Sequence, residues 1–197
     1  MYSVVIPERV FLFPAINSEL FSGRSRLAII PQTPNLFDAS IRENLDPLHK
    51  SSDEEIWSVI DMCDLRGVIT KLGGGLEVSL GENGRKLSLG QKQLVCLARA
   101  LLTKARVLCL DEATASVDYA TDQLIQRTLR TAFANCTIIT IAHRLQTVMD
   151  YDRIVVMAGG KIVECDTPER LLANPRSHFA MLYQQSQRSV FDSGPSG

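Results

Sequence analysis

The chain has 197 residues, with 21 Lys and Arg against 22 Asp and Glu, so its formal net charge is −1. This balance gives no electrostatic reason to expect binding to nucleic acid or to an anionic membrane surface. Hydrophobic residues make up 45% of the chain, which is typical of a globular domain and excludes intrinsic disorder. Because no apolar run reaches the roughly 18 residues of a membrane-spanning helix, we do not expect the chain itself to span a membrane.

The first strand that the sequence predicts is Leu27–Ile30, a short apolar run that ends at a proline. Gln32 therefore lies just beyond the end of a strand. Between residues 51 and 65, apolar side chains recur at helical spacing, and Ser52 with Glu55 three residues later fits a capping box. This pattern predicts an amphipathic helix.

The next predicted helix begins near Ser88 and continues to about Leu102, with apolar residues along one face. It is followed by Val107–Leu110, a continuous apolar run that leads directly into Asp111 and Glu112. Continuous apolarity is typical of a strand that is covered on both faces. The run therefore favours a parallel sheet.

Further elements follow in the second half of the chain. Leu124–Leu129 indicates a helix, and the β-branched run Thr137–Ile141 indicates a strand that ends next to His143. Residues 153–157 and 161–163 flank a pair of glycines and predict a β-hairpin. The alternation of strands and helices predicts an α/β fold.

The last predicted helix begins after Thr167, which is followed by a proline at the first helical position. The small, polar stretch 186–197 is expected to be a disordered tail. The five cysteines are odd in number and form no Cys-x-x-Cys pair, so they predict neither a disulfide framework nor a zinc site.

Polar side chains follow three of the predicted strands, namely Gln32, Asp111 with Glu112, and His143. The carboxyl ends of parallel strands face the ligand crevice, so we expect these side chains to converge. In a strand that ends in Asp-Glu, the first acid suits Mg²⁺ and the second suits an attacking water. A pair of surface acids is the alternative, and His143 alone also fits a hydrogen-bonded histidine at a strand edge.

A second candidate site is the helix start Ser88-Leu89-Gly90-Gln91. It offers a hydroxyl, a glycine that allows close backbone approach, and N–H groups at the positive end of the helix dipole, which together suit a phosphate. A plain helix cap is the alternative.

In their chain order these residues resemble the motifs of ATP-binding cassette (ABC) ATPases. Several runs look like the exporter type, among them Ile29-Ile30-Pro31-Gln32 and Ile141-Ala142-His143-Arg144-Leu145. Within the family the chain is similar to second nucleotide-binding domains of the multidrug resistance-associated (C) subfamily. The matching motifs are the Q-loop (Gln32), the signature (87–91), Walker B (107–112), the D-loop (115–118) and the H-loop (His143).

The resemblance implies a P-loop NTPase-like (RecA-like) parallel sheet core with an ABC helical subdomain. Residues 24–185 would form a partial nucleotide-binding domain, with the helical and signature subdomain at about 38–102 and the core at about 103–165. Residues 1–23 do not resemble the family.

The resemblance also implies ATP and Mg²⁺ as cofactors. Gln32 and Asp111 would contact Mg²⁺, Glu112 would be the catalytic base, and His143 would sense the γ-phosphate. Ser88 and Gly90 would bind ATP held by an opposite nucleotide-binding domain. Asp118 would act across the interface with that domain. Leu89 replaces the commoner glycine of the signature, with its side chain expected to point away from the phosphate. The full nucleotide-binding set would be Ser88, Leu89, Gly90, Gln91, Ser116 and Asp118.

The implied partners are a second nucleotide-binding domain and the transmembrane domains of an exporter, with no nucleic acid. The implied location is the cytoplasmic face of the plasma membrane or an endomembrane, and the chain alone would be cytoplasmic.

One motif of the family does not occur in the 197 residues, namely the phosphate-binding Walker A loop Gly-x-x-x-x-Gly-Lys-Ser/Thr. We therefore expect an N-terminally truncated domain with negligible ATPase activity and an aggregation-prone apolar surface. Three hypotheses stay open. The chain is a partial ATPase domain of an exporter of organic anions or xenobiotics, or a non-catalytic fragment that binds another nucleotide-binding domain through its signature face. The third hypothesis, half of a chromosome-maintenance or DNA-repair ATPase head, is disfavoured by the exporter-like runs.

Overall fold

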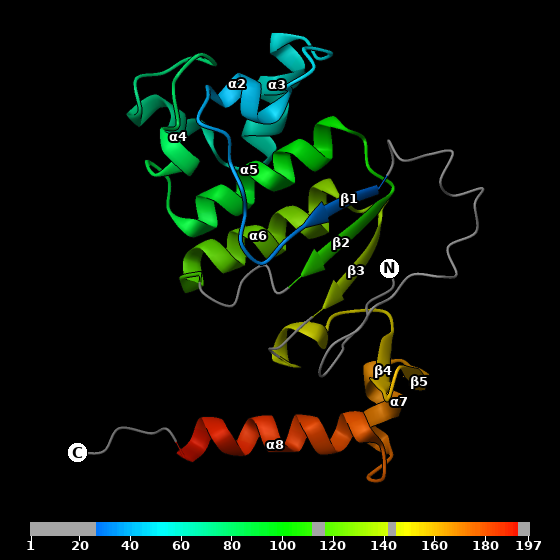
Figure 1. Ribbon diagram of the computed structural model, residues 1–197. Coiled ribbons are helices and arrows are strands. Elements are labelled where there is room, and N and C mark those ends of the chain that lie inside the picture. The colour runs from blue at the N-terminus through cyan, green and yellow to red at the C-terminus, as the bar shows by residue number, and fades with distance from the viewer. Residues whose placement is uncertain (1–26, 112–116, 142–144, 193–197) are drawn as a thin grey trace. The chain divides into compact units, whose positions relative to one another are not determined.

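A computed structural model describes residues 27–111, 117–141 and 145–192 (Figure 1). These residues divide into two compact units, one that extends to Thr137 and one that starts at Ile138. In chain order the elements are β1 (Leu27–Ile30), α2 (Ile41–Leu45), α3 (Asp53–Met62), α4 (Arg66–Lys71), the 3₁₀ turn η2 (Glu82–Gly84), α5 (Leu89–Leu102), β2 (Val107–Asp111), α6 (Tyr119–Ala132), β3 (Thr137–Ile141), the 3₁₀ turn η3 (Leu145–Val148), β4 (Ile154–Ala158), β5 (Lys161–Asp166), α7 (Pro168–Ala173) and α8 (His178–Asp192).

Strands β1, β2 and β3 form one sheet in that order. Strands β1 and β2 are parallel, with Leu27 opposite Val107 and Ile30 opposite Leu110. Ile30 and Leu110 are buried on one face, which α5 contacts at β1. On the other face Ile29 is 63% exposed, so the continuous apolar pattern of β1 is covered on one side only.

Helices α5 and α6 run side by side along this sheet (Figure 1). Helix α5 carries a broad apolar surface and also contacts α2 and α3, so it is the central element of this unit. The apolar side chains of α5 that are buried are Leu94, Val95, Cys96, Leu97, Ala98 and Ala100.

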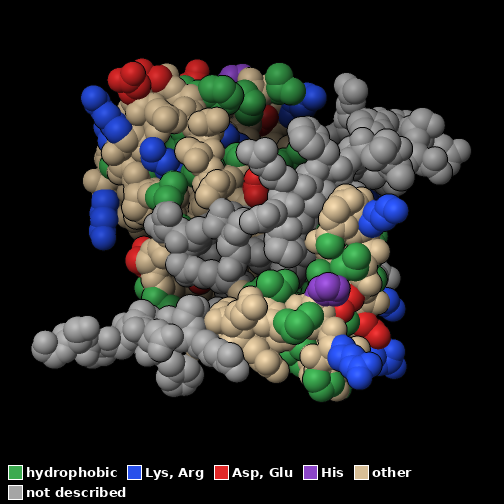
Figure 2. Space-filling view, turned by 60° about the horizontal axis from the view of Figure 1, so that its bottom comes forward, with side chains coloured by type: hydrophobic (Ala, Val, Ile, Leu, Met, Phe, Trp, Pro, Cys, Tyr) green, Lys and Arg blue, Asp and Glu red, His purple; other side chains and the backbone are tan. Residues whose placement is uncertain are grey.

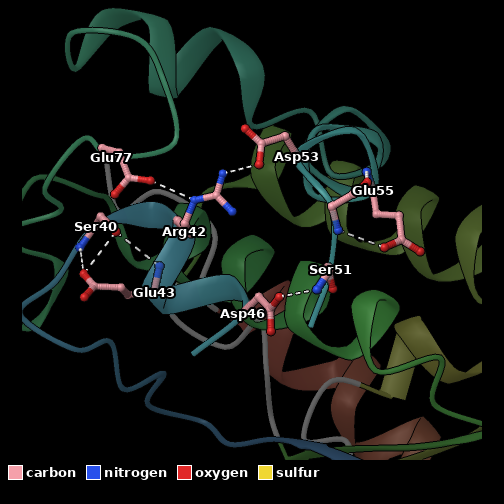
Figure 3. Close-up of polar contacts among 9 residues, drawn as sticks. Ser40, Arg42, Glu43, Asp46, Ser51, Asp53, Glu55 and Glu77 are labelled. Carbon is pink, nitrogen blue, oxygen red and sulfur yellow. Dashed lines mark hydrogen bonds and ion pairs between the residues drawn. The ribbon is translucent and has the colours of Figure 1, made fainter. Parts of the chain in front are cut away.

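The small helices beside α5 start with side-chain caps. Ser40 and Glu43 form a capping box at α2, and Ser52 and Glu55 form the predicted one at α3. Figure 3 shows how Arg42 holds this region together, because its guanidinium reaches Glu77 on one side and Asp53 on the other. Hydrogen bonds to Asp53 and then to Glu77 raise the pKa of Arg42.

The second unit contains the predicted hairpin, β4 and β5, followed by α7 and α8. Its core is an apolar cluster built around Phe179 at the start of α8. Glu164 of β5 fixes the N-terminus of that helix: its carboxylate accepts hydrogen bonds from His178 N–H (2.7 Å), Phe179 N–H (3.1 Å) and Ser177 Oγ–H (2.9 Å). Strand β5 and helix α8 are therefore joined by one carboxylate.

The strands and helices expected from the sequence are all present among the described residues, but the C-terminus differs. Helix α8 continues past Ser186 to Asp192, where a disordered tail is predicted. The stretch has no proline or glycine before Gly194, so nothing interrupts the helix. Residues 193–197 lie outside the described part.

Surface properties fit the composition. Figure 2 shows the Lys and Arg side chains of the described residues in separate small groups over the face in view. Among the described helices, none combines the length and apolarity needed to cross a membrane. All five cysteines are free: Cys63 and Cys96 are buried and Cys165 is exposed.

Candidate nucleotide-binding site

The signature sequence lies at the N-terminus of α5, as predicted. Ser88 is the N-cap, and its Oγ accepts a hydrogen bond from Gln91 N–H (3.2 Å) while its own N–H donates to Gln91 Oε1 (3.0 Å). The side chain of Ser88 is exposed. A serine hydroxyl that accepts a capping hydrogen bond still has its own hydrogen to donate. Ser88 is therefore able to cap α5 and to donate to a phosphate oxygen at the same time.

Gly90 has a packing role that the sequence does not reveal. A β-carbon at this position would overlap Thr121 Cγ2 of α6 and would lie 2.8 Å from Val117 Cγ1. The absence of a side chain therefore lets α5 approach α6 closely. Leu89, next to it, is half-buried.

Asp118 of the D-loop is the N-cap of α6. Its Oδ1 accepts a hydrogen bond from Thr121 N–H (3.0 Å), and its Oδ2 accepts one from Thr121 Oγ1 (2.8 Å). These hydrogen bonds hold the pKa of Asp118 below its ordinary value, and the bond from the Thr121 backbone has the largest effect. Thr121 thus bonds to the D-loop through its hydroxyl and packs on the signature through its methyl group.

Both predicted metal-binding residues are described. Gln32 follows β1 and Asp111 ends β2, both exposed, and the pairing of Ile30 with Leu110 places them at the same edge of the sheet. Among the residues that the structure describes, no three His, Cys, Asp or Glu side chains converge as a complete metal site. One carboxylate and one amide oxygen nevertheless fit Mg²⁺, which usually takes its remaining ligands from phosphates and water.

Three predicted site residues, Glu112, Ser116 and His143, lie outside the described residues. Their assignments stay predictions.

Comparison with known proteins identifies the family. A model of the ABC transporter family matches residues 14–115, about half of the chain. The chain belongs to the ABC transporter family. The match begins within the stretch 1–23, ahead of the motifs that suggest the family.

Two relatives at more than 50% identity belong to the C subfamily, which confirms the predicted subfamily. The ABC chain is 53% identical over 179 residues to ATP-binding cassette sub-family C member 10 of Mus musculus, a match that covers 91% of this chain and 12% of that protein. It is 52% identical over 167 residues to ATP-binding cassette sub-family C member 2 of Homo sapiens, covering 85% of this chain and 11% of that protein. The chain thus spans about a tenth of the length of these relatives.

A solved structure supports the fold. The ABC chain is similar to a bacterial Atm1-family ABC exporter with ATP bound, with a TM-score of 0.75 and 32% identity over 88% of this chain and 29% of that one. This likeness confirms the predicted P-loop NTPase-like α/β fold.

The sequence does not reveal the contacts of Thr121, Asn44 and Arg99, which lie beside the signature or the chain that follows Gln32. Helix α2, which carries Asn44, has a readable signal in Ser40 and Glu43, spaced as in a capping box. Arg99, a half-buried cation between two alanines of α5, is the other unused signal.

Proposed function

We propose that this chain binds Mg²⁺-ATP together with a second nucleotide-binding domain and so takes part in ATP-driven export. The observation that carries the proposal is the exposed hydroxyl of Ser88 at the start of a 14-residue helix that Gly90 fixes against α6. In this arrangement the Ser88 hydroxyl donates to the γ-phosphate of ATP held by the partner domain. Amide groups of the first turn of α5 add to the attraction.

At its own edge of the sheet, Asp111 and Gln32 would hold Mg²⁺. Bound there, the cation neutralises phosphate charge. Glu112 would accept a proton from the attacking water, His143 would donate to the γ-phosphate, and Ser116 and Asp118 would face the partner. In a parent transporter at the cytoplasmic face of a membrane, this cycle would drive the efflux of organic anions or xenobiotics through transmembrane domains.

A second candidate is favoured by one sequence observation. The 197 residues hold no Gly-x-x-x-x-Gly-Lys-Ser/Thr loop, which supplies the amide cradle and the lysine for phosphate in cis. A chain with only the signature face would complete the ATP site of another domain without turnover of its own.

The two candidates are separated by measuring ATP hydrolysis and association in parallel. The chain would be mixed with a nucleotide-binding domain that carries the Walker A loop, with and without Mg²⁺-ATP, and followed by sedimentation velocity. Both candidates predict ATP-dependent association. Hydrolysis by the mixture that Glu112→Gln in this chain lowers would favour the catalytic candidate, and association that does not depend on ATP would contradict both.

A further inference from the structure

Arg99 lies near the C-terminal end of α5, about 16 Å along the helix from Ser88. Its guanidinium donates three hydrogen bonds to the segment that follows Gln32: Nη1 to Asn35 O (3.0 Å), Nη2 to Asn44 Oδ1 (2.7 Å), and Nε to Asn44 O. These acceptors are 55 to 64 residues away in sequence. The signature helix is therefore tied to the chain beyond the Q-loop.

Asn44 relays this contact to Phe37. Its fully buried side chain accepts a hydrogen bond from Phe37 N–H (2.9 Å) and donates one to Phe37 O (3.1 Å). The backbone of Phe37 is thus bonded in both directions, and the same amide oxygen also binds Arg99. The Arg99 guanidinium carbon also lies 5.4 Å from the centre of the Phe37 ring.

Asn83 and Gly84 make a second set of contacts with the same loop. Leu36 N–H donates to Asn83 Oδ1 (3.4 Å), and a β-carbon on Gly84 would lie 2.5 Å from Leu36 Cδ1. Asn83 and Gly84 stand just ahead of the signature. Residues 35–37 are therefore held by contacts with the segment before Ser88 and with the helix after it.

The chemistry of Arg99 indicates a geometric role. All three of these bonds end on neutral amide oxygens, and burial lowers the pKa of Arg99, an effect that Cys96 partly offsets. Among the described residues no carboxylate pairs with Arg99. A partly buried cation whose desolvation is incompletely compensated contributes little net stability. A rigid fork of donors, by contrast, fixes two backbone carbonyls at once.

We propose that Arg99 is a positioning residue that couples the signature helix to the Gln32 loop. When Ser88 engages the nucleotide of a partner domain, displacement of α5 is transmitted through Arg99 and Asn44 to residues 33–37 and so to Gln32. The transmission rests on the proposed function, whereas the anchoring of the loop by Arg99 does not.

Amide hydrogen exchange of the full chain tests the anchoring. In Arg99→Met and in the milder Arg99→Lys, which keeps the charge but not the fork, we expect the Leu36 and Phe37 amides to exchange about tenfold faster, with α3 and α6 unchanged. The matched control is Arg42→Met, which removes an arginine bound to Asp53 and Glu77 in the same unit (Figure 3). It should leave Leu36 and Phe37 unaffected.

Uniform acceleration across the unit would show that Arg99 only stabilises the fold and would overturn the proposal. Unchanged exchange at Phe37 in both Arg99 variants would overturn it as well.

Exchange in the presence of a nucleotide-binding domain carrying Walker A and Mg²⁺-ATP tests the transmission. Association should slow exchange at Leu36 and Phe37 in the wild-type chain but not in Arg99→Lys, although both associate. Equal protection in the two chains would overturn the role of Arg99. Wild-type chain that fails to associate would contradict the proposed function, and the transmission with it, even where the anchoring result holds.

Discussion

The methyl group of Thr121 fills the space in which a β-carbon of Gly90 would stand, and Thr121 Cβ itself lies 3.1 Å from that position. The same Thr121 bonds to Asp118 through its hydroxyl and its backbone N–H. The signature and the D-loop are thus linked within one chain through Thr121. A glycine at the signature is needed for this packing whether or not a phosphate is bound.

Substitution of Gly90 by alanine should therefore destabilise the isolated chain. We expect Gly90→Ala to lower the free energy of unfolding in urea by about 1–3 kcal/mol, because the added methyl overpacks the α5–α6 contact. In Gly90→Ala, replacing Thr121 by serine removes the clashing Cγ2 and should restore part of the loss.

Gly67 of α4 is the matched control, because a β-carbon there would meet no atom within 4 Å. Gly67→Ala should leave the unfolding free energy unchanged or raise it by up to about 1 kcal/mol. Equal effects at Gly67 and Gly90 would contradict the packing role.

The Glu164 carboxylate gives α8 a pH dependence. Partial burial tends to raise the pKa of Glu164, but hydrogen bonds from His178 N–H, Phe179 N–H and Ser177 Oγ outweigh it and hold the pKa below the ordinary 4.5. A carboxyl whose folded pKa lies below its unfolded pKa stabilises the fold above the unfolded value, and loses that effect as pH falls through the folded value.

We therefore expect amide exchange in α8 to accelerate, relative to Glu164→Gln at the same pH, as pH falls below about 4.5. Glu164→Gln should show weak anchoring of α8 at every pH, and the control Glu169→Gln in α7 should behave as wild type. A wild-type chain whose α8 exchange differs from that of Glu164→Gln by the same factor at pH 3 and pH 7 would contradict this anchor.

The exposed face of β1 should promote self-association. Ile29 is 63% exposed, and its neighbour Ile30, on the opposite face, is 2% exposed. Ile29→Thr should reduce oligomers in sedimentation velocity with little change in stability. Ile30→Thr should instead destabilise the chain by about 2 kcal/mol or more, because it places a hydroxyl in the core. Identical sedimentation of wild type and Ile29→Thr would rule out association through this face.

Thiol reactivity should separate two cysteines in the native chain. Burial raises the pKa of Cys63 to about 12, so its thiol is protonated and shielded at pH 8. Cys165 is exposed in β5. We expect mass spectrometry to find Cys165 alkylated first by iodoacetamide and Cys63 alkylated only on unfolding. Comparable native rates would show that the α3 region opens readily.

Local features of this fold are predictable from sequence. The capping box at Ser52, the helix start near Ser88 and the apolar runs of β1 and β2 depend on neighbours within a few residues, and each element formed where expected. Gln32 and Asp111 lie at the same edge of the sheet because β1 and β2 pair in parallel.

Contacts between distant segments are not predictable in this way. The sequence predicts that Gly90 allows close approach of a phosphate, yet the atom nearest to a β-carbon at this position belongs to Thr121. The hydrogen-bond partners of Arg99 are 55 to 64 residues away in sequence. No periodicity in a single sequence encodes such pairs. The hydrogen bonds between Arg99 and the segment after Gln32, and the contact between Gly90 and α6, are therefore visible only in the three-dimensional structure.

The signature face is proposed to engage nucleotide held by another domain, and a comparison of Ser88 with Ser52 tests this most directly. Both serines cap helices with the same capping box, so Ser88→Ala and Ser52→Ala should each cost about 1 kcal/mol of stability. Only Ser88 is proposed to touch phosphate. In sedimentation with a Walker A-bearing domain and Mg²⁺-ATP, Ser88→Ala should weaken association by about 10- to 100-fold, the loss expected for a hydrogen bond to a charged group, while Ser52→Ala associates as wild type. Equal association of the two variants would contradict a contact between Ser88 and the nucleotide.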